Sequence, residues 1–137
     1  MWGECYNIET TTNIGITNLP PGLRIPPEIG QLSNLRYINL QDNKFTGNIP
    51  SEIGNLIDLE GLVITNNNFS GGIPSNIWSL SNLSFIHLGD NNLTGQISAN
   101  AGMGMANLML VNLEFNNFTG NIPNSLCAND LAGTFTH

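Results

Sequence analysis

Few side chains in this sequence could carry out acid–base or covalent chemistry. The histidines His87 and His137 and the cysteines Cys5 and Cys127 are each isolated, without a Cys-x-x-Cys or His-x-x-x-His spacing. No metal site and no cofactor is therefore expected. The serines recur without a base partner, and no G-x-x-x-x-G-K phosphate loop occurs. The sequence predicts a protein that is not an enzyme.

The residues that could act instead are suited to recognition. Tyr37, Phe85 and Leu110 recur at intervals of 48 and 25 residues, which places them in one column of a repeating structure. Exposed aromatic and Met side chains with acidic groups around them are typical of a protein or peptide contact patch, here for a basic or mixed-charge epitope. The predicted ligand-binding residues are Tyr37, Asn39, Asp42, Glu60, Val63, Phe85, His87, Asp90, Met109, Leu110, Glu114 and Phe115.

The composition excludes several other partners. Three Lys and Arg residues face ten acidic residues, for a net charge of −7. Nucleic acids and anionic membrane surfaces require a basic patch, so neither is an expected partner. No apolar run approaches the roughly 20 residues of a membrane span, so no membrane insertion is expected. Residues 1–5 show neither the basic nor the apolar region of a signal peptide.

The predicted ligand-binding residues can share one face only if a repeated element positions them. Four similar segments begin at Leu32, Leu56, Leu80 and Met105, at intervals of 24, 24 and 25 residues. A fixed period of this length predicts a solenoid. Within each segment, paired apolar residues alternate with polar ones, as expected of a short strand with one buried face, and successive strands must pair in parallel. These pairs are Ile38/Leu40, Leu62/Ile64, Ile86/Leu88 and Val111/Leu113.

An asparagine follows each strand where the chain must turn inward. A column of amides can satisfy backbone groups that the bend leaves buried, so these residues are predicted to be structural. They are Asn43, Asn67, Asn91 and Asn116. On the opposite side, Ser51–Leu56 and Ser75–Leu80 are expected to form single 3-10 or α turns with the serine as N-cap. Gly102–Gly104 adds a residue to the third regular coil, so that turn is expected to be the loosest.

The ends of the chain differ from the repeats. We expect one domain, with an N-terminal cap at 1–13, a degenerate first repeat at 14–31, four repeats at 32–123 and a C-terminal cap at 124–137. The first repeat is predicted to carry a strand at Ile14–Thr17, and Leu131 and Phe135 are expected to cover the last coil. Four steps of about 4.8 Å separate Cys5 from Cys127 by about 20 Å, too far for a disulfide. Each cysteine is therefore free or bonded to another chain.

After each asparagine the chain repeats x-[FL]-[TS]-G-x-I-P, at Phe45–Pro50, Phe69–Pro74 and Phe118–Pro123. With the L-x-x-L-x-L-x-x-N-x-L pattern, this segment resembles the plant-specific class of leucine-rich repeats. That class occurs in ectodomains of plant receptor kinases and in polygalacturonase-inhibiting proteins, with related arrays in bacteria and protists. Trp2-Gly3-Glu4-Cys5 also resembles the end of the family's N-terminal cap, with a shorter spacing and without the earlier cysteine.

The resemblance covers residues 14–127 and implies an α/β fold. The expected structure is a right-handed leucine-rich-repeat solenoid of about five coils. A parallel β-sheet would form the concave face and short 3-10 or α turns the convex face, often with a second small sheet at the T-G-x-I-P segment. The resemblance also implies an extracellular or cell-surface location.

Three functional hypotheses follow. The leading one is a non-enzymatic module that binds a protein or peptide through its concave face. The second is a self-associating array, such as a homo-dimer, because strand edges at the ends of the sheet invite pairing. The third is glycan or ice binding, suggested by the column Thr46, Ser70, Thr94 and Thr119. The glycosylation motifs at Asn68, Asn82, Asn92 and Asn117 carry little weight, because the repeat itself generates three of them.

Overall fold

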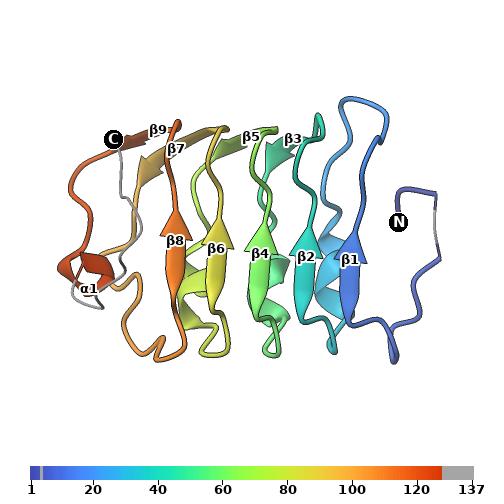
Figure 1. Ribbon diagram of the computed structural model, residues 1–137, viewed down its shortest axis with the longest axis horizontal. Coiled ribbons are helices and arrows are strands. Elements are labelled where there is room, and N and C mark those ends of the chain that lie inside the picture. Colours follow the sequence, from blue (N-terminus) through green and yellow to red (C-terminus); the bar gives the residue numbers. More distant parts are fainter. Residues whose placement is uncertain (4, 128–137) are drawn as a thin grey trace.

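The chain folds into a solenoid of stacked coils, with one strand of a five-stranded sheet in each coil (Figure 1). The computed structural model describes residues 1–3 and 5–127. The sheet is parallel, in the order β1-β2-β4-β6-β8. Its strands are β1 (Asn13–Gly15), β2 (Tyr37–Asn39), β4 (Gly61–Val63), β6 (Phe85–His87) and β8 (Leu110–Asn112). The predicted α/β solenoid is confirmed.

The register of this sheet follows the sequence repeat. Ile14 pairs with Ile38, Ile38 with Leu62, Leu62 with Ile86 and Ile86 with Val111. These central residues are all buried, so the residues on either side of them point to the opposite face of the sheet. The first strand was predicted at Ile14–Thr17 but occupies Asn13–Gly15, because only these residues pair directly with Tyr37–Asn39.

A second sheet forms where the T-G-x-I-P segments stack. It contains β3 (Thr46–Asn48), β5 (Asn68–Gly71), β7 (Asn92–Gln96) and β9 (Asn117–Thr119), in that order. Phe45 and Phe69 stack in the core beside it, with ring centroids 5.8 Å apart. Trp2 packs edge-on against Phe45 at 5.3 Å, and its Nε1–H donates a hydrogen bond to the Arg24 carbonyl (2.8 Å). The N-terminal segment thus covers the end of the core.

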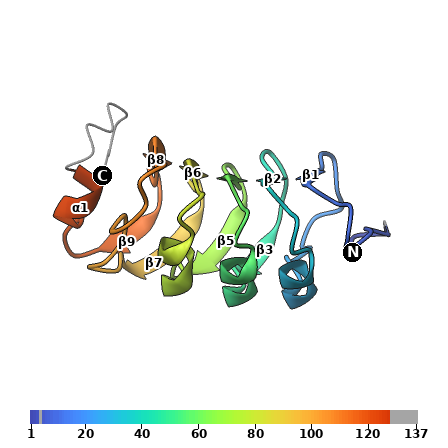
Figure 2. The same cartoon turned by 90° about the horizontal axis from the view of Figure 1, so that it is seen from below.

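Short 3-10 helices line the side of the solenoid opposite the five-stranded sheet (Figure 2). They are η1 (Pro27–Gln31), η2 (Ser51–Asn55) and η3 (Ser75–Ser79). The predicted serine N-caps are wrong. Pro50 and Pro74 occupy the cap position without a side-chain hydrogen bond, and each serine is already the first residue of its helix. The proline ring fixes φ, so the chain enters each helix from a preset extended conformation.

The stack of 3-10 helices ends at η3. Residues 99–104 form turns instead of a fourth 3-10 helix, so the predicted irregularity at Gly102–Gly104 is confirmed; its greater mobility stays a prediction.

Gly30, Gly54 and Trp78 occupy equivalent positions in successive coils. A Cβ on Gly30 would lie 2.7 Å from the backbone oxygen of the next helix, so close stacking requires glycine there. Trp78 is buried in the place of that glycine, where no 3-10 helix follows.

The two ends of the chain are described to different extents. Cys5 is exposed and forms no disulfide within the described residues; whether it bonds to another chain stays a prediction. The short helix α1 (Asn124–Cys127) ends the described part of the chain. Leu131, Phe135 and His137 lie outside the described residues, as does most of the expected C-terminal cap.

Candidate functional site

The solvent-facing side of the five-stranded sheet, called here the concave face, carries the predicted recognition residues. The register aligns Tyr37 with Gly61, Gly61 with Phe85 and Phe85 with Leu110, so these four residues form one column across the sheet. Tyr37 and Phe85 are both exposed. The Tyr37 ring lies over Gly61, where an added Cβ would come within 2.9 Å of the ring. The aromatic residues predicted to share one surface therefore do so.

At the N-terminal half of this face, Glu60 is bound by two neighbours. The Arg36 Nε–H donates a hydrogen bond to the Glu60 carboxylate at 2.7 Å, and an Arg36 Nη2–H and the Tyr37 hydroxyl also donate to it. The hydrogen bonds from Tyr37 and Arg36 lower the pKa of Glu60, and the bond to Glu60 raises the pKa of Tyr37. Glu60 was predicted to belong to an acidic rim. It is instead neutralised by Arg36, in the one salt bridge among residues 1–3 and 5–127.

The C-terminal half of the face lacks such internal pairing. Met109 and Phe115 flank β8 in sequence and are 66% and 71% exposed. Asp90 and Glu114 lie in adjacent coils, where the Asp90 backbone N–H donates to the Glu114 carbonyl at 2.9 Å. Within the described part of the chain, neither carboxylate has a hydrogen bond or an ion pair. This half presents exposed apolar groups beside acidic groups that remain available to a partner.

The other predicted site residues occupy the same face with smaller roles. Val63 and His87 are half-buried register neighbours on β4 and β6. The Asn39 side-chain oxygen accepts a hydrogen bond from the Gln41 backbone N–H at 3.1 Å, so it helps to end its strand. Asp42 accepts hydrogen bonds from Asn66 (2.8 Å) and Gln41 (2.9 Å), with that from Asn66 contributing most to the lowered pKa of its carboxyl.

Asn67 illustrates how the asparagine column supports the face. Its amide nitrogen donates to the carbonyls of Leu40 (2.9 Å), Ile64 (3.0 Å) and Thr65 (3.2 Å). Its amide oxygen accepts from the Phe45 backbone N–H at 3.0 Å. Each such side chain therefore ties the ends of two neighbouring strands to the turn that follows. Equivalent bonds are made by Asn43, Asn91 and Asn116.

The turn after each strand contains a residue whose backbone conformation was not predicted. Asn18, Asp42, Asn66, Asp90 and Phe115 occupy equivalent positions and have φ between 52° and 60°. Asn and Asp tolerate this left-handed conformation, whereas for a bulky residue it costs roughly 1–2 kcal/mol. A phenylalanine in a column of Asn and Asp is visible in the aligned repeats. Its backbone angle becomes known only from the structure.

Two of the four hydroxyl groups in the threonine column are bound within the protein. The hydroxyls of Thr46 and Thr119 donate hydrogen bonds to the carbonyls of Gly22 (3.1 Å) and Gly95 (3.3 Å) in the preceding coils. These hydroxyls therefore join coils to one another. The structure adds no support to the hypothesis of glycan or ice binding through this column.

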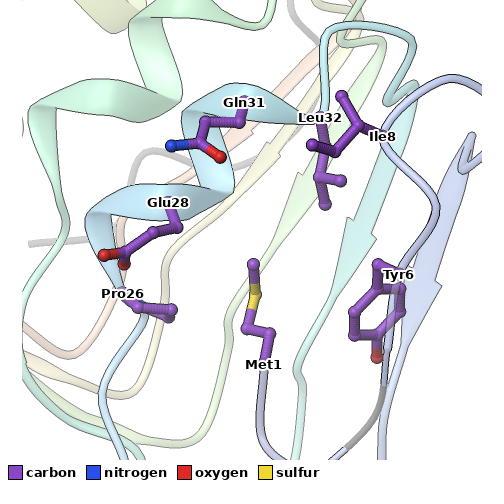
Figure 3. A pocket seen from close by; sticks show the side chains of 7 residues that line it. All are labelled: Met1, Tyr6, Ile8, Pro26, Glu28, Gln31 and Leu32. Atoms are coloured by element: carbon purple, nitrogen blue, oxygen red, sulfur yellow. The ribbon is translucent and has the colours of Figure 1, made fainter.

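A hollow of about 330 Å³ lies between the N-terminal segment and η1. Figure 3 shows Met1 between η1 and the chain that carries Tyr6 and Ile8. Its lining comes from the N-terminal segment and the first coil, away from the concave face. We therefore assign it to the packing of the cap.

The described residues contain no group of three or more His, Cys, Asp or Glu side chains that could hold a metal ion. In the same part of the chain, no helix has the length and apolar character needed to cross a membrane.

The Leucine Rich Repeat family model matches residues 34–56, 58–80 and 107–129. The chain belongs to the leucine-rich repeat family. Comparison with curated proteins gave no match.

Solved structures of plant receptor kinases are similar to this chain. The Arabidopsis receptor kinase HAESA, in complex with the peptide hormone IDA and the co-receptor SERK1, is 32% identical with a TM-score of 0.79 over 84% of this leucine-rich-repeat chain. The ectodomain of the receptor kinase SOBIR1 from Arabidopsis thaliana is 34% identical, with a TM-score of 0.73 over 79% of this chain. This chain covers 19% of the HAESA chain and 58% of the SOBIR1 chain.

A third similar structure is a plant ice-binding protein, 32% identical with a TM-score of 0.72. That match covers 77% of this chain and 34% of the ice-binding protein. This chain spans only 17% of the PEPR1 chain in the similar PEPR1-AtPEP1 structure. The similarity is therefore to a part of each of these proteins.

Proposed function

We propose that this leucine-rich repeat protein is a non-enzymatic recognition module that binds a protein or peptide through its concave face. The observation that carries the proposal is the group of exposed apolar residues on that face, Tyr37, Phe85, Met109 and Phe115, with carboxylates beside them. Most monomeric proteins expose such residues singly, and contiguous apolar groups usually mark a contact surface. The similar HAESA structure contains a bound peptide hormone, which supports a peptide or protein ligand here.

The similarity to receptor ectodomains also supports a location outside the cell or on its surface. An acidic protein with few charged residues on its recognition face would select partners by apolar contacts and a limited number of ionic ones. The expected ligand is thus a peptide or protein epitope of basic or mixed charge. No cofactor, nucleic acid or membrane insertion takes part in this proposal.

The test is selection of ligands from a randomised twelve-residue peptide library displayed on phage. Peptides enriched on the wild-type chain are synthesised and their affinities measured by fluorescence anisotropy. The double variant Tyr37→Ala, Phe85→Ala should lose most of the affinity while keeping the circular dichroism spectrum of the wild type. Unchanged affinity in the double variant would show that the site is elsewhere.

Self-association is the second candidate, and the edge of β8 favours it. In earlier coils, the backbone N–H groups of Leu40, Ile64 and Leu88 donate to carbonyls of the next coil (2.8–2.9 Å). Leu113 is the equivalent residue in the β8 coil, and its N–H makes no such bond within the described residues. An open strand edge can pair with another chain. Light-scattering mass across a concentration series, with and without reductant, distinguishes edge pairing from a cysteine-linked dimer, and a strict monomer would rule out both.

A further inference from the structure

Phe115 combines a strained backbone conformation with a largely exposed side chain. Its φ of 52° lies in the left-handed region, and 71% of the residue is exposed. The aromatic ring pairs of the described residues, Trp2 with Phe45 and Phe45 with Phe69, do not include it. A bulky residue kept in a costly conformation, with its side chain in solvent, is more useful in binding than in folding.

The charge distribution along the chain indicates what could bind there. The only Lys and Arg residues are Arg24, Arg36 and Lys44, so none occurs after residue 44. Six acidic residues lie beyond that point. They are Glu52, Asp58, Glu60, Asp90, Glu114 and Asp130. The C-terminal two thirds of the solenoid therefore attracts cations, and no lysine or arginine in that part of the sequence competes for its carboxylates.

Two of these carboxylates belong to the coils that meet at Phe115. The Asp90 N–H donates to the Glu114 carbonyl at 2.9 Å, and the Asn91 N–H donates to the Phe115 carbonyl at 3.1 Å. Asp90 and Phe115 thus occupy equivalent turns of neighbouring coils, and Glu114 precedes Phe115. By contrast, the carboxylates of Glu60 and Asp42 in earlier coils are already bound within the protein. Acidic groups available to a ligand are therefore found beside the strained aromatic residue.

We propose that Phe115 is the anchor of the recognition surface and that its ligand is a cationic peptide segment of a protein. In this segment a lysine or arginine is adjacent to a large apolar side chain. The apolar side chain packs on Phe115, and the cation lies near Asp90 and Glu114. A cation that reaches the face of the Phe115 ring gains a further attraction. This inference rests on the proposed function, because it places the ligand on one half of the same face.

The proposal predicts opposite effects of one substitution on stability and on binding. Phe115→Asn introduces the residue type that the earlier coils use at this position, so the left-handed conformation becomes less costly. The melting temperature should rise by about 3–5 °C. The affinity for cationic peptides should fall at least tenfold, because the anchor is lost. If Phe115 were instead retained for its packing, Phe115→Asn would lower the melting temperature.

A matched control removes an equally exposed apolar residue elsewhere. Ile57 is 68% exposed and lies in the turn between η2 and β4. Ile57→Asn should leave peptide affinity unchanged. The double variant Asp90→Asn, Glu114→Gln tests the charge contribution: its affinity should fall and should depend less on salt concentration, since fewer ionic contacts remain to be screened.

The probes are the twelve-residue phage-displayed peptides described above, each tested as a synthetic peptide on every variant. Enrichment of Lys or Arg beside apolar residues, with weaker binding to Phe115→Asn, supports the inference. Peptides that depend on Tyr37 and Phe85 but bind Phe115→Asn normally would overturn the inference and leave the proposed function intact. Enrichment of acidic peptides would overturn the stated ligand chemistry. Failure to enrich any peptide would count against both proposals.

Discussion

Replacing Asp58 with asparagine should stabilise the solenoid, because Asp58 interrupts a ladder of side-chain hydrogen bonds. Asn34, Asn82 and Asn107 occupy equivalent positions between the 3-10 helices or turns and the strands. Each donates through Nδ2 to a backbone carbonyl of the preceding coil, at 2.6, 3.0 and 3.1 Å. Asp58 is the remaining member of this set, 24 residues after Asn34 and 24 before Asn82. The same arrangement places it opposite the Ser33 carbonyl. A carboxylate cannot donate a hydrogen bond there.

The size of the effect follows from what asparagine would add. One net hydrogen bond at an exposed site contributes about 0.5–1.5 kcal/mol. Asp58 also attracts Arg36, which contributes slightly to the raised pKa of Arg36. That attraction is between exposed groups and is screened by solvent, so its loss should not cancel the gain. We expect Asp58→Asn to increase the free energy of unfolding by about 1 kcal/mol and the melting temperature by about 3–5 °C.

The assay is urea unfolding followed by circular dichroism, at two salt concentrations. The reverse variant, Asn82→Asp, should lose a similar amount of stability because it breaks an existing bond of the ladder. Glu114→Gln removes the same charge as Asp58→Asn at a site without a side-chain hydrogen bond, so it controls for the change in net charge. Equal stability of Asp58→Asn and the wild type, or an equal gain in Glu114→Gln, would refute the hydrogen-bond explanation.

Three further predictions concern residues that support the concave face. Asn67→Ala should lower the free energy of unfolding by about 3–5 kcal/mol in urea unfolding, because it leaves buried backbone groups without partners. An equal loss in an exposed Asn68→Ala variant would contradict this explanation. Gly30→Ala should destabilise the chain, because its Cβ would lie 2.7 Å from a backbone oxygen, whereas Gly15→Ala, with no atom within 4 Å, should change the melting temperature little. The lowered pKa of Glu60 means that its contribution to stability is present above its ordinary value of 4.5 and is lost as pH falls through the folded-state pKa. Glu60→Gln should therefore flatten the acid side of the stability–pH profile, and an unchanged profile would show that the pairing contributes nothing.

Much of the fold was predictable because the repeat is local and periodic. The buried positions of Ile38, Leu62, Ile86 and Val111 follow from alternation within each strand, and their alignment follows from a fixed offset of 24 or 25 residues. The serine caps could not be assigned from composition, because serine favours both the N-cap and the first turn of a helix. The preceding proline decided between them, through its fixed φ.

The candidate site was predictable in position but not in its internal pairing. Outward-facing residues follow from the strand period, so the sequence placed Tyr37, Phe85 and Phe115 on one face. It could not show that Glu60 is bound by Arg36 and Tyr37, because partners 23 and 24 residues apart meet only when two coils stack. The division of the face into a paired half and an available half is therefore a property of the tertiary structure.

The sequence by itself determined the solenoid, its parallel sheet and the residues that point outward from that sheet, because each depends on a repeating pattern of apolar and polar residues. Only the tertiary structure decided which carboxylates remain available and that the backbone of Phe115 is strained. Those properties depend on contacts between coils and on the backbone angle at a single turn, where Phe115 adopts a conformation that the other coils give to Asn and Asp.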